Sequence, residues 1–314
     1  MTDTLDRNTI YKKVGLVLRA IARDLYLMDT SEQIPTIRHY VDALDVSRRT
    51  VQDAMTQMIE ADAIRLERRG CKGSYLAYKD SKKLYLMSGW ASITGMMPVP
   101  LTDGLKSLAT AIYQSLSKYP ELSFSFAFIQ GSVQRAENLK HMPSTFMLCS
   151  LSAAKAICES SNEYQIAFTL PNCLYAKPFV LAYRKGEKAS FKEGGKLGCD
   201  HSSHDQKFLA TKLAELYQMD CVDTPYVGLL KALVDHRIDA TAYRSETSLT
   251  GHPGLEYTEL PQDFNFSDDV TTPVVLVHRK DYGLAELLKD KIDFSELAEQ
   301  QKLILEEKAE AMFR

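Results

Sequence analysis

The stretch IPTIRHYVDALDVSRRTVQDAMTQMIEADAI, residues 34–64, holds two short amphipathic segments separated by a break. Pro35 fits the first turn of one helix, because its fixed φ suits a position whose N–H needs no partner. Ser47 can cap a second helix that begins with Arg48 and Arg49. In a helix-turn-helix the second helix enters the DNA major groove, and its N-terminal residues reach base edges and phosphates. The sequence therefore predicts a DNA-reading element here.

Flanking segments predict a winged version of this element. Apolar residues recur at helical spacing over residues 9–28, which indicates an amphipathic helix before Pro35. Two short strands, Ile64–Arg68 and Ser74–Tyr78, are predicted around a turn that contains glycine. Basic residues outnumber acidic ones around this hairpin, although the whole chain has a net charge of −3. Such a local basic surface is what binding to phosphates requires.

Composition indicates a globular chain of more than one domain. The 314 residues are 45% hydrophobic and 25% charged, which is enough for two domains with sizeable cores. There is no apolar run typical of a signal peptide or a membrane span. The six cysteines are scattered without a CxxC pair, which fits a reducing cytosol better than a disulfide framework. We expect a cytoplasmic protein with no membrane partner.

After a polar segment at residues 79–83, predicted to be a linker, apolar strands alternate with helices. The predicted strands are 84–87, 123–129, 145–149, 196–199, 239–243 and 272–279. The predicted helices are 102–118, 132–140, 152–160, 204–218, 226–236, 281–290 and 294–312. This alternation predicts α/β layers with mainly parallel sheets.

Several separated elements of the N-terminal part resemble the winged-helix domain of GntR-type transcription regulators. They are IPT followed by Arg38, then ALDVSRRTVQDAM, ADAI and RRGCKGSYL, and the similarity covers roughly residues 9–78. Ile37 departs from the glutamate usual there, and Gln52 from a frequent DNA-reading arginine. RRGCKGSYL in front of an α/β domain of this length looks most like the YhfZ group of bacterial regulators. That family pairs such a head with a C-terminal domain resembling type 2 periplasmic-binding proteins.

The resemblance implies an architecture and a set of DNA contacts. A winged helix-turn-helix domain would cover residues 1–79. A two-lobed α/β domain would cover 84–314, with lobe 1 at about 84–178 and 273–314 and lobe 2 at about 179–272. The strands PFVLAYRK and TPVVLVHR would cross between the lobes. The implied DNA contacts are Arg38, Ser47, Arg48, Thr50, Gln52, Lys72 and Gly73. We add Arg49 from its place beside Arg48.

Candidate ligand-binding residues follow from the predicted strands. In open α/β sheets, ligands bind at the carboxyl ends of strands near helix N-termini, whose free N–H groups favour anions. Four places qualify, and Arg244 could bind an acid bidentately. They hold Ser88, Gly89, Trp90 and Ser92; Ser150 and Ser152; His201, Ser202 and Ser203; and Tyr243 and Arg244. A serine before a helix is equally a routine N-cap, and Trp90 could simply fill a core.

The sequence contains no recognisable metal-binding, cofactor-binding or catalytic motif. The segment CDHSSHD, residues 199–205, offers potential ligands but no second pair from a separated element, so we expect no metal. No phosphate-binding glycine loop, nucleophile elbow or HExxH is present, so we expect no cofactor and no enzyme. The prediction is a ligand-responsive regulator, a homodimer on double-stranded operator DNA, that senses a small anionic metabolite. Two alternatives stay open: a constitutive DNA-binding protein with a degenerate cleft, and an enzyme that carries a DNA-binding head.

Overall fold

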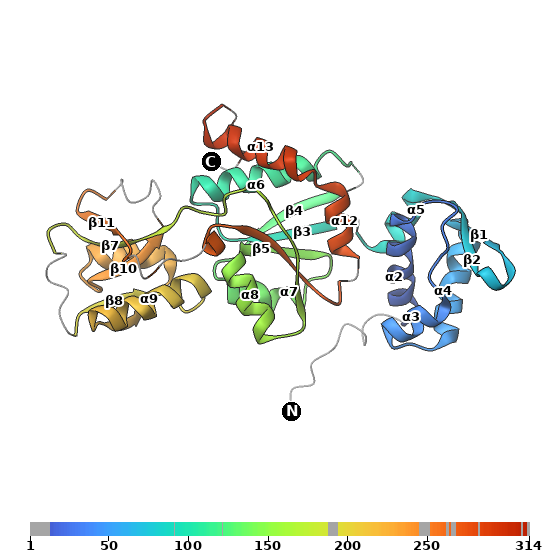
Figure 1. The fold of residues 1–314 in the computed structure, drawn as a ribbon, viewed down its shortest axis with the longest axis horizontal. Helices are drawn as coiled ribbons and strands as arrows, with labels where there is room; N and C mark the ends of the chain where they lie inside the picture. The colour runs from blue at the N-terminus through green and yellow to red at the C-terminus, as the bar shows by residue number, and fades with distance from the viewer. Residues whose placement is uncertain are drawn as a thin grey trace. The chain divides into compact units, whose positions relative to one another are not determined.

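The computed structural model describes residues 13–90, 92–120, 122–187, 194–244, 252–261, 264, 268–281, 283–308 and 310–312. The chain forms two compact units (Figure 1). We call Met1–Ile93, Ser117–Phe124 and Lys280–Lys291 the head unit. Thr94–Leu116, Ser125–Arg279 and Ile292–Arg314 are the α/β unit. Among the described residues, no helix is both long enough and apolar enough to cross a membrane.

The head unit contains the predicted winged helix-turn-helix. Its elements are α2 (Lys13–Leu27), α3 (Ile37–Leu44), α4 (Arg48–Glu60), β1 (Ile64–Arg68), the 3-10 turn η1 (Gly70–Lys72), β2 (Ser74–Lys79), α5 (Ser81–Ser88) and α12 (Leu284–Lys291). β1 and β2 pair antiparallel, which confirms the predicted hairpin. The helix predicted over 9–28 is confirmed as α2, and residues 9–12 lie outside the described residues.

Local capping signals define the two helices of the motif. The Thr36 hydroxyl accepts a hydrogen bond from the His39 amide at 3.1 Å and caps α3. Asp45 has a left-handed backbone with φ 50°, which ends α3 and makes the turn. The Ser47 hydroxyl accepts from the Thr50 amide at 3.2 Å and caps α4, as predicted.

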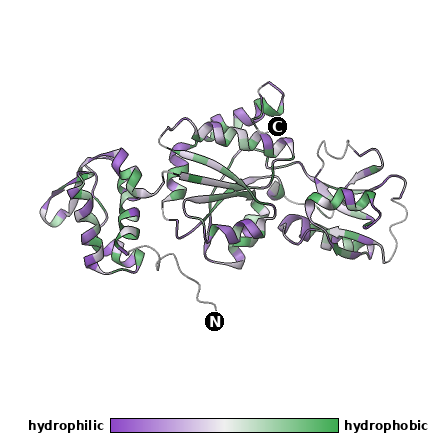
Figure 2. Ribbon diagram, turned by 180° about the vertical axis from the view of Figure 1, so that it is seen from behind, coloured by the Kyte–Doolittle hydropathy of each residue, from purple (hydrophilic) through white to green (hydrophobic). Residues whose placement is uncertain are grey.

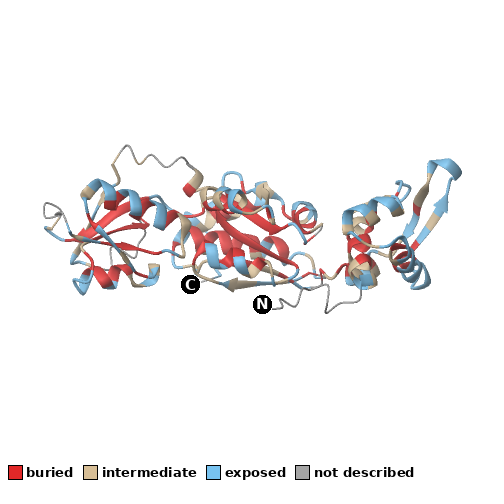
Figure 3. Cartoon of the chain, turned by 90° about the horizontal axis from the view of Figure 1, so that it is seen from below, coloured by how far each residue is buried: buried red, intermediate tan, exposed pale blue. Residues whose placement is uncertain are grey.

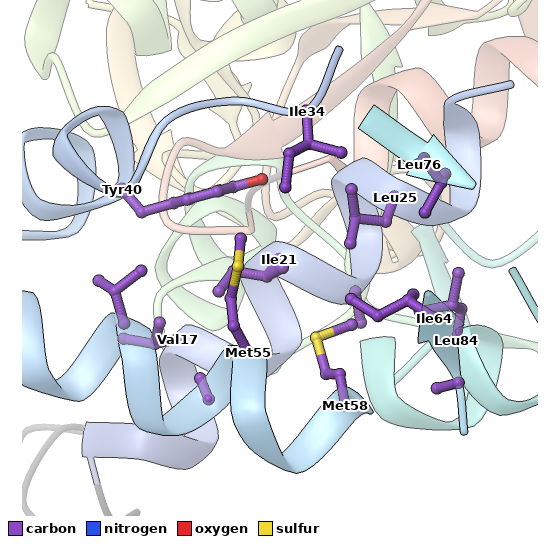
Figure 4. Packing of buried hydrophobic residues seen from close by; sticks show 14 residues of the cluster. Val17, Ile21, Leu25, Ile34, Tyr40, Met55, Met58, Ile64, Leu76 and Leu84 are labelled. Atoms are coloured by element: carbon purple, nitrogen blue, oxygen red, sulfur yellow. The ribbon is translucent and has the colours of Figure 1, made fainter. Parts of the chain in front are cut away.

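Apolar side chains from helices and wing form one core in the head unit. Figure 4 shows Ile21 of α2, Met58 of α4 and Leu76 of β2 directed toward one another. All three are fully buried. Leu84 of α5 joins the same cluster. Burying a side chain of this size contributes about 1.5–3 kcal/mol, so α5 is part of the head and not a linker.

The strand predicted at 84–87 and the linker predicted at 79–83 are both wrong. Asp80 caps α5 by accepting from the Lys83 amide at 3.0 Å, and Gly89 ends the helix with φ 75°. Helical spacing places Leu84 and Ser88 on the buried side. A short apolar run does not distinguish a strand from a buried helical turn by itself.

A segment from far along the chain completes the head unit. The buried Arg23 guanidinium lies 3.8 Å from the Asp281 carboxylate and donates to the Ser88 carbonyl at 2.9 Å. The Trp90 ring lies 5.4 Å from the Arg23 guanidinium carbon. A Cβ built on Gly283 would lie 3.2 Å from Trp90, which shows how closely this segment packs. The compact head unit therefore includes residues beyond position 84 and a segment from near the end of the sequence.

Trp90 should report on the head unit alone. It is the only tryptophan of the chain and is fully buried in that unit. We expect blue-shifted emission in the native protein and a red shift that follows unfolding of the head unit in urea. Far-ultraviolet circular dichroism follows both units, so the two transitions should separate if the units unfold independently. Solvent-like emission from the native protein would contradict the burial of Trp90.

One sheet of the α/β unit has the strand order β4-β3-β5-β12-β6. Its strands are β3 (Ser92–Met97), β4 (Ser123–Phe128), β5 (Thr145–Ser150), β6 (Tyr164–Thr169) and β12 (Pro273–His278). The helices next to these strands in sequence are α6 (Asp103–Leu116), α7 (Ser132–Leu139), α8 (Leu151–Ser160) and α13 (Phe294–Leu305). β3 runs parallel to β5, whereas β12 runs antiparallel to both β5 and β6.

The other sheet has the order β11-β7-β10-β8-β9. Its strands are β7 (Phe179–Arg184), β8 (Lys196–Cys199), β9 (Asp220–Asp223), β10 (Ala240–Arg244) and β11 (Leu255–Glu259). Between them lie α9 (His204–Tyr217), the 3-10 turn η3 (Tyr226–Gly228) and α10 (Leu229–Val234). A further 3-10 turn, η5 (Asp268–Val270), precedes β12. β7 pairs antiparallel with β10 and β11, and β8 pairs parallel with β10 and β9.

The α/β class is confirmed, but the expectation of mainly parallel sheets is wrong because both sheets are mixed. The expectation that two strands cross between the lobes is also wrong, because both are interior strands of a single sheet. β7 lies within the second sheet and β12 within the first. The chain instead passes between the sheets after β6 and before β12. Figure 2 shows hydrophobic residues concentrated on the strands. Figure 3 shows the two sheets largely buried and the wing largely exposed.

Candidate functional site

A concave surface lies where α3, α4 and the wing meet. Its charged lining residues are Arg38, Arg48 and Arg68, and none of the described lining residues is acidic. Polar groups from Thr36, Gln52, Thr56 and Ser74 surround them. Arg38 lies 3.6 Å from Asp42, which is outside the lining, whereas Arg48 and Arg68 have no ion pair among the described residues. The lining therefore has an excess of positive charge that attracts phosphate.

The structure brings together half of the predicted DNA contacts. Arg38, Arg48, Gln52 and Gly73 line the concave surface. The other four lie outside this lining. Ser47 and Thr50 bond to each other through their hydroxyls at 2.8 Å, and Arg49 and Lys72 are exposed. Gly73 needs to be glycine, because its φ is 84° and a Cβ there would lie 2.9 Å from Gln33.

Arg68 is a lining residue that sequence reasoning missed. Its neighbours Arg65 and Arg69 are held by acids, at 3.1 Å from Asp62 and 2.8 Å from Glu67. Hydrogen bonding to Glu67 raises the pKa of Arg69. Arg68 has no ion pair among the described residues, so its charge stays available for a phosphate. The basic run around the wing was visible in the sequence, but the pairing that separates Arg68 from its neighbours was not.

Cys71 offers a direct test of wing contact. It is exposed at the wing tip, between Gly70 and Lys72, whereas Cys149 and Cys199 are buried. Burial raises the pKa of Cys149 and of Cys199 to about 12, so neither forms thiolate near neutral pH. Cys221 is exposed as well, but desolvation raises the pKa of its thiol. We therefore expect iodoacetamide to label Cys71 fastest, and bound DNA to slow that labelling at least tenfold. Labelling that is unchanged by DNA would show that the wing tip stays free. Peptide mass spectrometry would read each site.

The second candidate is a cleft between the two sheets of the α/β unit. Its cavity of about 80 Å³ is lined by residues from both sheets and from the connections between them. The ionisable lining side chains are Arg135, Cys149, Tyr175, Asp205, Tyr226 and Arg244. A cavity of this volume holds only two or three waters at roughly 30 Å³ each. The cleft therefore contains little free space.

Arg244, at the end of β10, joins segments on both sides of the cleft. Its guanidinium donates to the Lys177 carbonyl at 3.0 Å and to the Val270 carbonyl at 3.1 Å. It also lies 3.3 Å from Asp205 Oδ2. The guanidinium carbon lies 3.9 Å from the centre of the Phe179 ring. Arg244 thus holds together the two connections between the sheets.

Asp205 bridges the two sheets from the start of α9. Its Oδ2 accepts from the Ser150 hydroxyl at 2.7 Å, and Ser150 also caps α8 by accepting from the Ala153 amide at 3.1 Å. Asp205 Oδ1 is buried without a hydrogen-bond partner among the described residues. Arg135 of α7 is 2% exposed, and its Nε likewise has no partner among the described residues. Buried polar groups are nearly always hydrogen-bonded, so both atoms call for an explanation.

Two further contacts close the cleft at the N-terminus of α7. The Val133 amide donates to the Ser202 carbonyl at 3.3 Å, and the His204 amide donates to the Ser132 hydroxyl at 3.1 Å. Gly131 precedes them with φ 79°. A Cβ on Gly131 would lie 2.5 Å from the Ser202 hydroxyl and 2.7 Å from its carbonyl oxygen. Only glycine fits this approach of the two segments.

Tyr175 and Cys149 are neutral lining groups. Burial raises the pKa of Tyr175 to about 12, as it does for Cys149. Both stay protonated at physiological pH, so they offer a hydroxyl and a thiol and no negative charge. The charged lining groups are then the two guanidiniums and the Asp205 carboxylate.

Sequence reasoning located the cleft only in part. Ser150, Ser203 and Arg244 line it as predicted, whereas Ser152, His201, Ser202 and Tyr243 are not among its lining residues. The placement of Ser88, Gly89, Trp90 and Ser92 after a strand is wrong, because α5 precedes them. Arg135, Tyr175 and Asp205 were missed. Asp205 is part of the segment CDHSSHD that was considered for metal binding from the sequence. Among the described residues, no group of three or more histidine, cysteine, aspartate or glutamate side chains is placed to hold a metal ion.

Comparisons with known proteins agree with both parts of the fold. The family model described as helix-turn-helix domain matches residues 30–76, and the one described as YhfZ C-terminal domain matches residues 80–313. The uncharacterized protein YhfZ of Escherichia coli K12 is 30% identical over 301 residues, which cover 95% of this chain and 97% of that protein.

Solved structures give the same relationship. The crystal structure of YhfZ from Shigella flexneri matches with a TM-score of 0.58 and 27% identity, covering 73% of this chain and 97% of that one. The alkanesulfonate-binding protein SsuA from Xanthomonas axonopodis pv. citri, bound to MOPS, matches with a TM-score of 0.52 and 12% identity. That likeness covers 69% of this chain and 75% of SsuA, and it shows the periplasmic-binding-protein fold alone. With one family model matching more than half of the chain and a relative matched over nearly its whole length, the protein belongs to the YhfZ family.

Proposed function

We propose that the protein is a DNA-binding transcription regulator whose α/β unit senses a small anionic metabolite. The observation that carries the DNA-binding part is the acid-free concave surface, in which Arg48 at the start of α4 lies with Arg38 and Arg68. In this motif the second helix lies in the major groove and its N-terminal residues contact base edges, which is the position of Arg48. Because its partner is chromosomal DNA, the protein would act in the cytoplasm.

The winged helix is of GntR-like type in this proposal. Winged helices that read a two-fold operator do so as dimers, so that each head contacts one half-site. We therefore propose a homodimer on double-stranded operator DNA.

Ligand sensing is supported by the composition of the cleft. Two buried guanidiniums and one carboxylate line it, so the lining side chains carry an excess of one positive charge. Burying an uncompensated charge is costly, and an anion would offset that cost. The Tyr175 hydroxyl and the Cys149 thiol, with pKa values raised to about 12, are poor bases and nucleophiles at neutral pH. This favours binding over catalysis.

Fluorescence anisotropy with the full chain would test the proposal. The DNA would be the region upstream of the protein's own gene, with an unrelated duplex of equal length and composition as the control. We expect at least 100-fold tighter binding to the upstream DNA at 0.1 M salt. A metabolite that the cleft binds should change this affinity, because a ligand shifts an equilibrium only by its differential affinity for the two states.

Two results would contradict the proposal in different places. Equal affinity for both duplexes would remove the regulator function. Selective DNA binding that no acidic metabolite alters would instead support the constitutive alternative, in which the cleft no longer senses anything.

A further inference from the structure

Two buried atoms of the cleft have no hydrogen-bond partner among the described residues, and they limit the chemistry of a ligand more narrowly than the charge of the lining does. Arg135 Nε is a hydrogen-bond donor and Asp205 Oδ1 is an acceptor, and both belong to side chains that are at least nine-tenths buried and line the same cavity. Each atom has no hydrogen-bond partner among the described residues. A molecule that satisfies both must present an acceptor to Arg135 and a donor to Asp205.

The charges of the lining side chains limit the acceptor to one negative charge. Arg135 and Arg244 carry two positive charges, and Asp205 carries one negative charge that already faces Arg244 at 3.3 Å. The remaining positive charge is that of Arg135. A monocarboxylate would neutralise it, whereas a dianion would leave one buried negative charge and a zwitterion would leave the positive charge.

The donor is then a neutral group. A hydroxyl donates to Asp205 without adding charge, whereas an ammonium would restore the excess that the carboxylate removes. The cavity of about 80 Å³ is far below the roughly 300–1,000 Å³ of ordinary metabolite sites. The ligand must therefore be only a few carbon atoms long. Arg135 Nε and Asp205 Oδ1 each have less than 1 Å² of accessible surface, so the walls of the cleft must move apart for a ligand to reach them.

We propose that the cleft binds a small hydroxy-monocarboxylate, with its carboxylate on Arg135 and its hydroxyl on Asp205. This assignment rests on the proposed function of the cleft as a sensor and names the chemical class of its ligand. Ser150 and Arg244 hold Asp205 Oδ2 in place, which leaves Oδ1 directed to the ligand hydroxyl.

Isothermal titration calorimetry of the full chain with a matched set of acids would test the assignment. Glycolate carries the hydroxyl and one carboxylate, acetate lacks the hydroxyl, glycine replaces it by an ammonium, and oxalate carries two negative charges. Lactate, propionate, alanine and malonate repeat the comparison with one more carbon. We expect the hydroxy acid of each series to bind at least tenfold tighter than the other three.

Variants of the two side chains separate a binding role from a structural one. Arg135→Gln should abolish hydroxy-acid binding, since no lining positive charge remains in excess. Asp205→Asn removes a negative charge, so the lining then has an excess of two positive charges. The affinity for oxalate relative to that for glycolate should therefore rise at least tenfold. A merely structural residue would not invert this preference. Ser152→Ala, on α8 outside the lining, should bind as the wild type does.

Folding and DNA binding are measured on the same preparations. Thermal unfolding identifies a variant that fails to fold. If Arg135→Gln fails, Arg135→Lys replaces it, because lysine keeps the charge and lacks Nε. We expect the hydroxy acid to bind Arg135→Lys about tenfold more weakly than the wild type. The assignment would be overturned if glycine, oxalate or acetate bound more tightly than glycolate, and if the same held for their three-carbon counterparts and lactate. Ligand sensing would still stand. Absence of binding by every acid, with selective DNA binding intact, overturns the assignment. The sensor function is overturned only if, in addition, no acidic metabolite alters the DNA affinity. Absence of DNA selectivity alone would remove the regulator function and leave the ligand assignment standing.

Discussion

Replacing Arg48 and Arg68 together by alanine should weaken binding to the upstream DNA by about 100-fold at 0.1 M salt, from the loss of two charged contacts. Arg48 begins α4 and Arg68 ends β1, and both line the acid-free concave surface. Neither has an ion pair among the described residues, so neither gives up an internal partner to meet a phosphate. Each lost phosphate contact should also lower the slope of log K against log salt by about 0.9.

The salt series makes this prediction specific. A slope smaller by roughly two shows that both guanidiniums displace counterions. Arg237→Ala, an exposed arginine of the α/β unit, is the matched control for removing a charge. Arg49→Ala should have a smaller effect, because Arg49 lies outside the concave lining and 3.9 Å from Asp53. If the double variant bound like the Arg237→Ala control, DNA would have to contact another surface of the head.

Replacing Gly131 by alanine should hold the cleft open. The added Cβ would meet the Ser202 carbonyl oxygen at 2.7 Å, and backbone atoms cannot rotate away as a side-chain end can. The positive φ of 79° adds strain of about 1–3 kcal/mol for a residue other than glycine. We expect at least tenfold weaker binding of the cleft ligand. DNA binding without ligand should be unchanged, since the head unit is untouched.

Hydrogen exchange would show whether the effect arises from the clash. The amides of Val133 and His204 are both hydrogen-bonded across the cleft, so both should exchange faster in Gly131→Ala. Gly186→Ala is the control, because its φ is 77° while a Cβ there meets no atom within 4 Å. It reproduces the backbone strain without the contact. Equal exchange in the two variants would mean that the cleft does not open.

The head could be predicted from sequence because its signals are local. Pro35, the Ser47 cap and the glycines of the wing each determine the backbone within a few residues, and their order specifies the motif. The prediction of a strand at residues 84–87 was wrong for the opposite reason, because distant contacts and not local signals decide their structure. Leu84 and its neighbours form a helix that packs in the head core, and only the tertiary contact distinguishes it from a strand.

The cleft could be predicted only at its helix caps. Ser150 and Ser203 precede helices, which the sequence shows directly. Arg135 lies within an amphipathic helix, where an arginine reads as a solvated residue, and its 2% exposure depends on how the sheets and their connections close over it. Asp205 was visible only as a polar residue near the start of a helix. The contacts that hold Asp205 in the cleft join it to Ser150 and Arg244, which are 55 and 39 positions away in the sequence.

The segment Lys280–Lys291 has a consequence for how the protein is made. Asp281 supplies the partner for the buried Arg23, and Lys291 Nζ lies 5.5 Å from the centre of the Tyr26 ring. We therefore expect the head of a nascent chain to reach its full packing only when almost the whole chain has been synthesised. Without this segment Arg23 keeps its hydrogen bond to the Ser88 carbonyl but loses the Asp281 carboxylate. Removing one partner of a buried ion pair typically costs about 3–5 kcal/mol. A chain built this way completes its DNA-binding head only when the α/β unit between the two parts of the head has also been translated.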